Sequence, residues 1–247
     1  MTFSLPRRQP QIVAQVVAAR TVTPHMRRLT LGGPTLHTLL STDGIDAPAA
    51  WVKIFPPGRE GRAYTVRHVD RAAGTLDIDF VLHGDERHDD GSVSAWARQA
   101  AIGAGLGIAG PRHGGFALQA DARWLWLAAD ASALPAIQRI LETLPADLDV
   151  HVLVLVGDAR ERQPLPTRAR LQETWLYADA PGADIDALLA DVFDRARRLG
   201  HDGQVWIAGE SGLVRHWRSL WSPLTPAQLS AKGYWKHGER DHRDREG

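Results

Sequence analysis

Residues 124–132 read WLWLAADAS and decide the fold of the second half of the chain. The first six residues are a continuous apolar run with the length of a buried strand, which is typical of a parallel sheet covered on both faces. Ser132 stands where a helix N-cap is expected, ahead of a helix-like segment at 133–144. The stretch therefore predicts a strand that leads directly into a helix, the repeating unit of an α/β domain.

The same alternation continues downstream. Apolar runs predict three more strands, and two helices separate or follow them, the strands at 150–156, 175–177 and 205–208 and the helices at 185–199 and after 209–212. This order predicts a parallel, doubly wound sheet that binds ligands at the carboxyl ends of its strands. The segments 130–135 and 209–212 are therefore candidate binding loops, although neither carries G-x-G-x-x-G and the chain has no P-loop motif.

The first half of the chain has the period of β-structure. In TLDIDFVLH at 75–83, residues 76, 78, 80 and 82 are predicted to face a core, and the alternate positions a partly wet surface. Further strands are expected at 51–55 and 63–69, and a hairpin of 12–19 and 26–31 about Thr23-Pro24. Short strands at this spacing predict a small barrel. We place the domains at 1–118 and 119–238, with a charged tail at 239–247.

Composition excludes several classes of protein. The 247 residues carry 29 Lys plus Arg against 29 Asp plus Glu, so a nucleic-acid surface of uniform positive potential is not expected. With no cysteine, disulfides, thiol nucleophiles and cysteine-bound metal clusters are excluded, and redox chemistry would need an organic cofactor or a substrate metal. No apolar run is long enough to span a membrane, and no zinc-type histidine motif occurs. We expect a cytoplasmic monomer without a metal site of its own.

Two segments of the first half could bind a phosphorylated planar ligand. In RAYTVR at 62–67, a guanidinium suits phosphate oxygens and Tyr64 offers a ring for stacking. The alternative interpretation of these residues is a solvated strand face. His83-Gly84, followed by GSVSAWA at 91–97, predicts a turn into a short helix whose first N–H groups favour an anion. The alternative is a Ser-capped surface helix with Trp96 in the core and a structural His83.

Taken together, these pieces resemble one family in order and spacing. The matching segments are KIFPP at 53–57, RAYTVR at 62–67, DIDFVLHG at 77–84, GSVSAWA at 91–97, GPR at 110–112, DASALPAI at 130–137, WIAGE at 206–210 and GYWKHG at 233–238. They resemble the siderophore-interacting proteins, which are flavin-dependent ferric-siderophore reductases of the ferredoxin-reductase-like superfamily. The resemblance covers residues 10–238 and implies a six-stranded antiparallel FAD-binding barrel followed by a Rossmann-like NAD(P)H-binding domain.

The resemblance also implies roles for individual residues. Tyr64 and Thr65 would be the catalytic pair, with Thr65 near the reactive N5 edge of the flavin. FAD would be held by the segment from Arg62 through Tyr64, Thr65 and Val66 to Arg67, and by His83, Gly84, Gly91, Ser92, Val93, Ser94 and Trp96. The nicotinamide side would be bordered by Asp130, Ser132, Ala208, Gly209 and Glu210. Lys53 and Lys236 would face the ferric siderophore.

The chain departs from the family pattern at two places. The family usually has Gly-Pro where this chain has Gly91-Ser92, and Asp-Glu-Thr where it has Asp130-Ala131-Ser132. Ser92 restores a backbone N–H, and Ala131 removes a carboxylate from the expected pyridine-nucleotide contact. The expected activity is hydride transfer from NAD(P)H to FAD, then single-electron transfer to siderophore-bound Fe(III). NADH, NADPH and ferredoxin all stay open as donors, and a general flavin or ferredoxin-type reductase and a non-catalytic siderophore-binding module are the alternatives.

Overall fold

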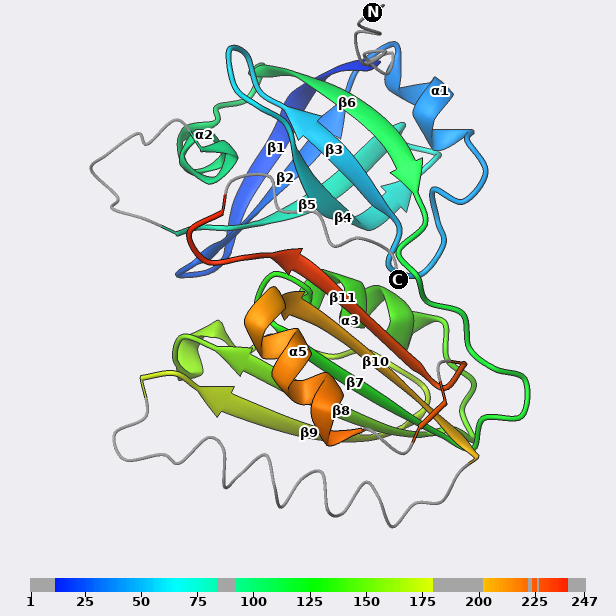
Figure 1. The fold of residues 1–247 in the computed structure, drawn as a ribbon. Helices are drawn as coiled ribbons and strands as arrows, with labels where there is room; N and C mark the ends of the chain where they lie inside the picture. Colours follow the sequence, from blue (N-terminus) through cyan, green and yellow to red (C-terminus); the bar gives the residue numbers. More distant parts are fainter. Residues whose placement is uncertain (1–11, 84–91, 180–201, 222–223, 226, 240–247) are drawn as a thin grey trace, which may run out of the picture.

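The computed structural model describes residues 12–83, 92–179, 202–221, 224–225 and 227–239, which form a β-barrel above an α/β sheet (Figure 1). The barrel is closed and antiparallel, in the order β1-β2-β5-β4-β3-β6. Its strands are β1 (Ile12–Thr23), β2 (Met26–Gly32), β3 (Trp51–Phe55), β4 (Arg62–Asp70), β5 (Thr75–Val81) and β6 (Gly105–Arg112). Two short helices join them, α1 (Leu36–Leu40) and α2 (Val93–Gln99). The predicted barrel is confirmed.

Strand β5 shows why the alternation of the sequence was informative and where it fell short. Leu76, Ile78 and Phe80 are fully buried in the barrel core, as predicted. Asp79, expected on a partly wet face, is only 3% exposed and accepts hydrogen bonds from Arg28 Nε at 2.5 Å and Nη2 at 2.7 Å. The buried carboxylate is therefore held by a bidentate ion pair rather than by water.

The second domain is a parallel sheet of five strands in the order β11-β10-β7-β8-β9. The strands are β7 (Trp124–Asp130), β8 (Asp149–Val156), β9 (Arg170–Tyr177), β10 (Gly203–Glu210) and β11 (Leu229–Trp235). The other elements described here are α3 (Leu134–Glu142), the 3₁₀ helix η1 (Ala159–Glu161) and α5 (Ser211–Leu220). Every residue of β7 is buried, as the apolar run predicted. The predicted helix at 185–199 lies outside the described residues.

The domain differs from the predictions in three details. Strand β9 begins at Arg170 rather than 175; the sequence did not indicate its first half because those residues are exposed and form no apolar run. Strand β11 was not predicted, since Ser, Lys and Gly interrupt its apolar residues and the strand lies at the sheet edge. Ser132 is not the N-cap of α3: that position belongs to Ala133, and the Ser132 hydroxyl donates to Asp130 instead.

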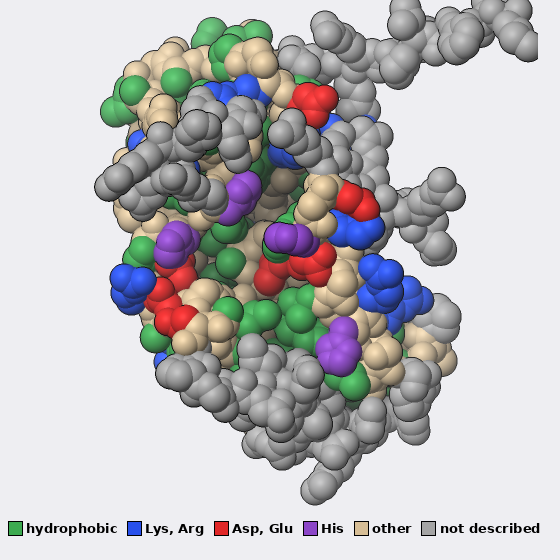
Figure 2. All heavy atoms as spheres, turned by 60° about the vertical axis from the view of Figure 1, so that its left-hand side comes forward, with side chains coloured by type: hydrophobic (Ala, Val, Ile, Leu, Met, Phe, Trp, Pro, Cys, Tyr) green, Lys and Arg blue, Asp and Glu red, His purple; other side chains and the backbone are tan. Residues whose placement is uncertain are grey.

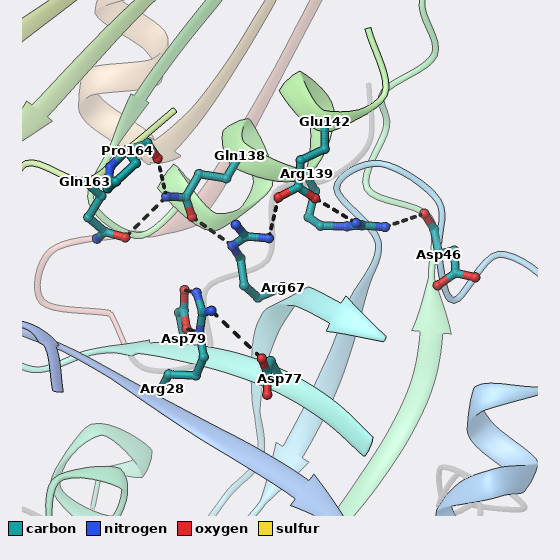
Figure 3. A network of polar contacts seen from close by, with 10 residues as sticks. All are labelled: Arg28, Asp46, Arg67, Asp77, Asp79, Gln138, Arg139, Glu142, Gln163 and Pro164. Carbon is teal, nitrogen blue, oxygen red and sulfur yellow. Dashed lines mark hydrogen bonds and ion pairs between the residues drawn. The ribbon is translucent and has the colours of Figure 1, made fainter. Parts of the chain in front are cut away.

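Polar contacts join the barrel to the second domain through α3, which lies between the barrel and the sheet (Figure 1). Arg67 of β4 donates to Gln138 at 2.9 Å and forms an ion pair with Glu142 at 2.9 Å (Figure 3). Arg139 reaches the backbone carbonyl of Asp46 at 3.1 Å. One helix is thus attached to two separate parts of the barrel.

A second set of polar contacts joins the tip of the β1–β2 hairpin to η1. The carboxylate of Glu161, a residue only 4% exposed, accepts hydrogen bonds from the Thr23 hydroxyl at 2.5 Å and from the backbone N–H of His25 at 3.0 Å. The imidazole Nδ1 of His25 also lies 3.0 Å from this carboxylate. A buried carboxylate of one domain therefore holds a hairpin of the other.

Candidate functional site

The RAYTVR segment lies on β4, but its side chains do not simply alternate. Thr65 and Val66 are both buried, at 5% and 2% exposure, because the β4–β5 register shifts between Val66 and His68. Val66 belongs to the barrel core, and Arg67 turns to α3 as described above. Arg67 is thus occupied at the domain contact, while Arg62 lies within 3.5 Å of Glu60 and donates to the Gly61 carbonyl at 3.0 Å. The structure does not bring the two guanidinium groups together in one phosphate site.

Aromatic rings surround this part of the barrel. The ring centroids of Tyr64 and Phe80 are 4.4 Å apart, and those of Phe80 and Trp96 are 6.3 Å apart in an edge-on arrangement. Burial, opposed only by the charge of Arg62, raises the pKa of Tyr64. Its phenol therefore stays neutral, as suits a ring that packs against another ring.

The predicted anion-binding turn is partly described. Ser92 is the N-cap of α2: its side chain accepts from the Ala95 N–H at 3.0 Å, and its carbonyl accepts from Arg59 at 2.9 Å. Ser94 donates to the Val81 carbonyl at 3.0 Å and accepts from the His83 N–H at 3.1 Å. Ser94 thus fastens α2 beside the end of β5, whereas the Ser92 hydroxyl caps the helix itself.

The remaining residues of this turn divide into core and rim. Val93 is buried in the barrel core, and Trp96 packs against that core. His83 is exposed, and its carbonyl accepts a hydrogen bond from Arg98 at 3.1 Å. Gly84 and Gly91 lie outside the described residues, so their expected contacts stay predictions.

At the carboxyl edge of the sheet, Asp130 holds three strand ends together. Its carboxylate accepts from the Ser132 N–H at 2.8 Å and hydroxyl at 2.5 Å, from the Glu210 N–H at 2.7 Å and from the Trp235 indole at 2.9 Å. Gly209 adopts φ of +148°, and a Cβ there would lie 2.7 Å from the Asp130 carboxyl carbon. A side chain at 209 would therefore displace this carboxylate.

Glu210 caps the helix that follows this edge. Its carboxylate accepts from the Leu213 N–H at 2.9 Å and the His237 N–H at 3.3 Å. Burial acts to raise the pKa of Glu210, but the backbone N–H groups of Leu213, His237 and Gly212 outweigh it and hold that pKa below its usual value. Ala208, the remaining predicted residue here, is fully buried within β10.

The two halves of the site meet at Thr65 and Tyr234. The Tyr234 hydroxyl lies near enough to the Thr65 hydroxyl to affect the pKa of the phenol. Both hydroxyls are buried, and neither makes a hydrogen bond to a described residue. Tyr234 and its neighbour Trp235 had no predicted role, although both lie in the GYWKHG motif. A recognised β11 would have placed them beside Asp130.

The two predicted siderophore lysines lie on different domains. The Lys53 ammonium lies 5.8 Å from the centroid of the Phe55 ring on β3. Lys236 follows β11 and forms an ion pair with Glu239. The structure shows no contact between the two lysines in the described part of the chain, so their shared role stays a prediction.

A space-filling view shows one face of the molecule. Figure 2 shows a hollow at the level where barrel and sheet meet, with hydrophobic, acidic and histidine side chains around it. In the part of the chain that the structure describes, no three His, Asp or Glu side chains gather as a metal site would require. None of the described helices is both long and apolar enough to cross a membrane.

Family models match both domains. The model for siderophore-interacting FAD-binding domains matches residues 57–115, and the model for siderophore-interacting proteins matches residues 122–238. The first therefore covers the barrel strands that carry Tyr64 and Thr65, and the second covers the whole parallel sheet. The fold itself also occurs in the ferredoxin reductase of carbazole 1,9a-dioxygenase, at 15% identity with a TM-score of 0.70, which covers 91% of this chain and 69% of that one.

Individual relatives agree with these matches. A siderophore utilization protein from T. fusca is 30% identical with a TM-score of 0.78, over 94% of this chain and 95% of that chain. Ferric vibriobactin reductase ViuB from Vibrio cholerae is 31% identical over 73% of this chain and 66% of its own length. The mycobactin import protein IrtA from Mycolicibacterium smegmatis is 28% identical over 91% of this chain, which spans only 26% of that protein. The chain belongs to the siderophore-interacting protein family.

Proposed function

We propose that the protein is an FAD-dependent ferric-siderophore reductase that carries electrons from NAD(P)H to siderophore-bound Fe(III). The observation that carries this proposal is the presence of two buried, unsatisfied hydroxyls near the domain boundary, Thr65 of the barrel and Tyr234 of the sheet. Buried polar groups without partners are uncommon in proteins and call for an explanation, such as a bound group that satisfies them. The family match supports FAD as that group, since the model for siderophore-interacting FAD-binding domains matches residues 57–115, which include Thr65.

The residues present fit a flavin. Tyr64 offers a neutral ring already packed on Phe80, and Thr65 offers a hydroxyl. Arg62, partly exposed at the start of β4, would serve the phosphate, helped by the first backbone N–H groups of α2. When bound, FAD would supply the one property this chain lacks, acceptance of two electrons and their release one at a time.

The second domain would supply the electron donor. Asp130 fixes the ends of β7, β10 and β11, so that Gly209 and Glu210 border the carboxyl edge where open α/β sheets bind nucleotides. Since Asp130 already accepts four hydrogen bonds from the protein, we assign it a positioning role and not a proton-transfer role. The chain's choice among NADH, NADPH and ferredoxin is left to experiment.

The relatives support the substrate class. ViuB is named a ferric vibriobactin reductase, and the match with it covers most of this chain. Lys53 and Lys236 would attract an anionic ferric complex, and their effect should weaken as salt is added. Reduction would open the complex because oxygen donors hold Fe(II) less tightly than Fe(III). Transport is not proposed, because the chain spans only a quarter of IrtA.

The test begins with flavin binding. We expect the protein to take up FAD, to show the visible absorption of bound flavin, and to gain about 2.7 kcal/mol of stability when FAD is present at a hundred times its Kd. Anaerobic NADPH or NADH should then bleach the flavin, and a ferric siderophore should restore its colour. Failure to bind FAD would overturn the proposal at its first step.

Substrate preference separates the remaining alternatives. We expect faster turnover of a ferric siderophore than of free flavin or a small ferric chelate, and a higher KM for the siderophore in K53A and K236A. Arg170→Ala is the matched control, since it removes a positive charge at the start of β9, on the opposite edge of the sheet. Equal turnover of all acceptors would favour a general flavin reductase. Siderophore binding without bleaching would favour a non-catalytic module.

A further inference from the structure

One tyrosine hydroxyl in the described part of the chain still lacks an assigned hydrogen-bond partner. The hydroxyl of Tyr234 is buried and has no hydrogen-bond partner among the described residues, although the residue as a whole is partly exposed. The nearby hydroxyl of Thr65, on the other domain, is in the same condition. A hydroxyl has one proton to donate and lone pairs to accept with, so burying two of them unpaired costs free energy. Their placement therefore requires a physical reason.

The register of the strands shows that this meeting is part of an ordered contact. Trp51 of β3 is the direct register partner of Thr65 on β4, so the two side chains lie on one face of the barrel wall. The β10–β11 register shifts beside Tyr234, but the Tyr234 ring packs with Trp206, whose register partner Ser230 lies two residues before Lys232. Lys232 and Tyr234 therefore lie on the same face of β11. The Lys232 ammonium lies 5.6 Å from the Trp51 ring centroid. Lys232 therefore lies over Trp51 as Tyr234 lies against Thr65.

Other contacts fix the position of the Tyr234 ring. Its centroid is 6.4 Å from that of Trp206 in an edge-on arrangement, and Trp206 is fully buried. The next residue, Trp235, is bound by its indole to Asp130 and by its carbonyl to the Ser211 hydroxyl. The chain on both sides of Tyr234 is thus held by the sheet, which fixes the place of its hydroxyl at the boundary with the barrel.

The direction of a hydrogen bond between them follows from their chemistry. Burial raises the pKa of Tyr234, with Thr65 opposing and the charge of Asp130 adding to the rise, so the phenol keeps its proton. A neutral phenol is a better donor than an aliphatic hydroxyl, and the natural acceptor is Thr65 Oγ1. With that lone pair occupied, the proton of Thr65 is left for an acceptor elsewhere.

We propose that Tyr234 is a positioning residue of the flavin site, which donates to Thr65 so that the Thr65 hydroxyl presents its proton to the redox-active edge of the isoalloxazine. This inference rests on the proposed binding of FAD. It adds a residue of the second domain to a site otherwise built by the barrel. It also makes flavin binding depend on the contact between the domains, because Thr65 is ordered from across the boundary.

The test is a double-mutant cycle of Y234F and T65V, read by FAD affinity, by the position of the flavin absorption bands and by the flavin midpoint potential. Phe keeps the ring contact with Trp206 and removes only the hydroxyl. We expect Y234F to weaken FAD binding by about three- to tenfold, the value of one hydrogen bond, and to shift the flavin bands. The double variant should match T65V alone, because Tyr234 acts only through Thr65.

Tyr177→Phe is the matched control, since Tyr177 ends β9 at the other edge of the same sheet and packs against the same core. It should leave affinity, bands and potential unchanged. The inference is overturned if Y234F binds FAD with unchanged affinity and spectrum, or if the effects of Y234F and T65V multiply in the double variant. A wild-type protein that binds no FAD would instead overturn the proposed function, and this inference with it.

Discussion

Replacing Glu161 by alanine is expected to destabilise the protein because it removes the acceptor that joins the hairpin tip to η1. The Glu161 carboxylate lies 2.5 Å from the Thr23 hydroxyl and 3.0 Å from the His25 N–H, and Thr23 is itself only 6% exposed. E161A would leave the buried Thr23 hydroxyl unpaired, which costs about 1–3 kcal/mol, whereas the N–H of the exposed His25 can turn to water and adds at most about 1 kcal/mol. The imidazole of His25 adds little, since its side chain is 54% exposed.

The sum predicts a loss of about 1–4 kcal/mol in the free energy of unfolding. For a chain of this size, that loss corresponds to a fall in Tm of about 2 to 16 °C, measurable by thermal and urea unfolding. E161Q should lose less, because its amide oxygen can still accept one of these hydrogen bonds. The matched control is Glu173→Ala, which breaks an exposed 2.6 Å ion pair with Arg162 worth about 0–1 kcal/mol. The reasoning is refuted if E161A destabilises the protein no more than E173A.

Two further predictions concern the sheet edge. Gly209→Ala places a Cβ 2.7 Å from the Asp130 carboxyl carbon at a φ of +148°, so we expect the free energy of unfolding, measured in urea, to fall by about 1–3 kcal/mol. The control Gly58→Ala, at a φ of +70° with nothing within 4 Å of the new Cβ, should lose less. Equal losses in the two variants would contradict the steric argument. The pKa of Glu210 is lowered in the folded state, so its cap stabilises the fold fully above the ordinary glutamate pKa of about 4.5, and this stabilisation is lost as pH falls from there through the lowered pKa. Unfolding measured against pH should therefore show a smaller acid dependence in E210Q than in wild type, and identical slopes would count against this cap.

The sequence predicts the elements whose residues meet a uniform environment. Strand β7 is buried on both faces, so its residues are all apolar and the strand is visible without any tertiary information. Strand β5 likewise alternates because one of its faces meets the barrel core. Strand β11 escapes prediction because its side chains meet the linker, the barrel and solvent in turn, as Ser230, Lys232 and Trp235 show. No single period describes such a strand.

The site was predictable where a motif names its residues, and not where a tertiary contact selects them. Tyr64 and Thr65 could be found from RAYTVR, but the shift of register after Val66, which turns Arg67 toward α3, left no mark in the sequence. Ser132 fits the cap position by residue type, yet its hydroxyl donates a hydrogen bond to the nearby Asp130 carboxylate instead. The contact of Thr65 with Tyr234 joins distant parts of the chain and could not be read from either part.

The position of β11 in the chain has a consequence for biosynthesis. All six strands of the barrel, which end at Arg112, leave the ribosome before residues 229–235 are made. Because domains generally fold in the order of their synthesis, the barrel can form while Tyr234 is still untranslated. If Tyr234 positions Thr65 as proposed, a nascent chain would bind flavin weakly at first, and its affinity would rise only when the last strand docks.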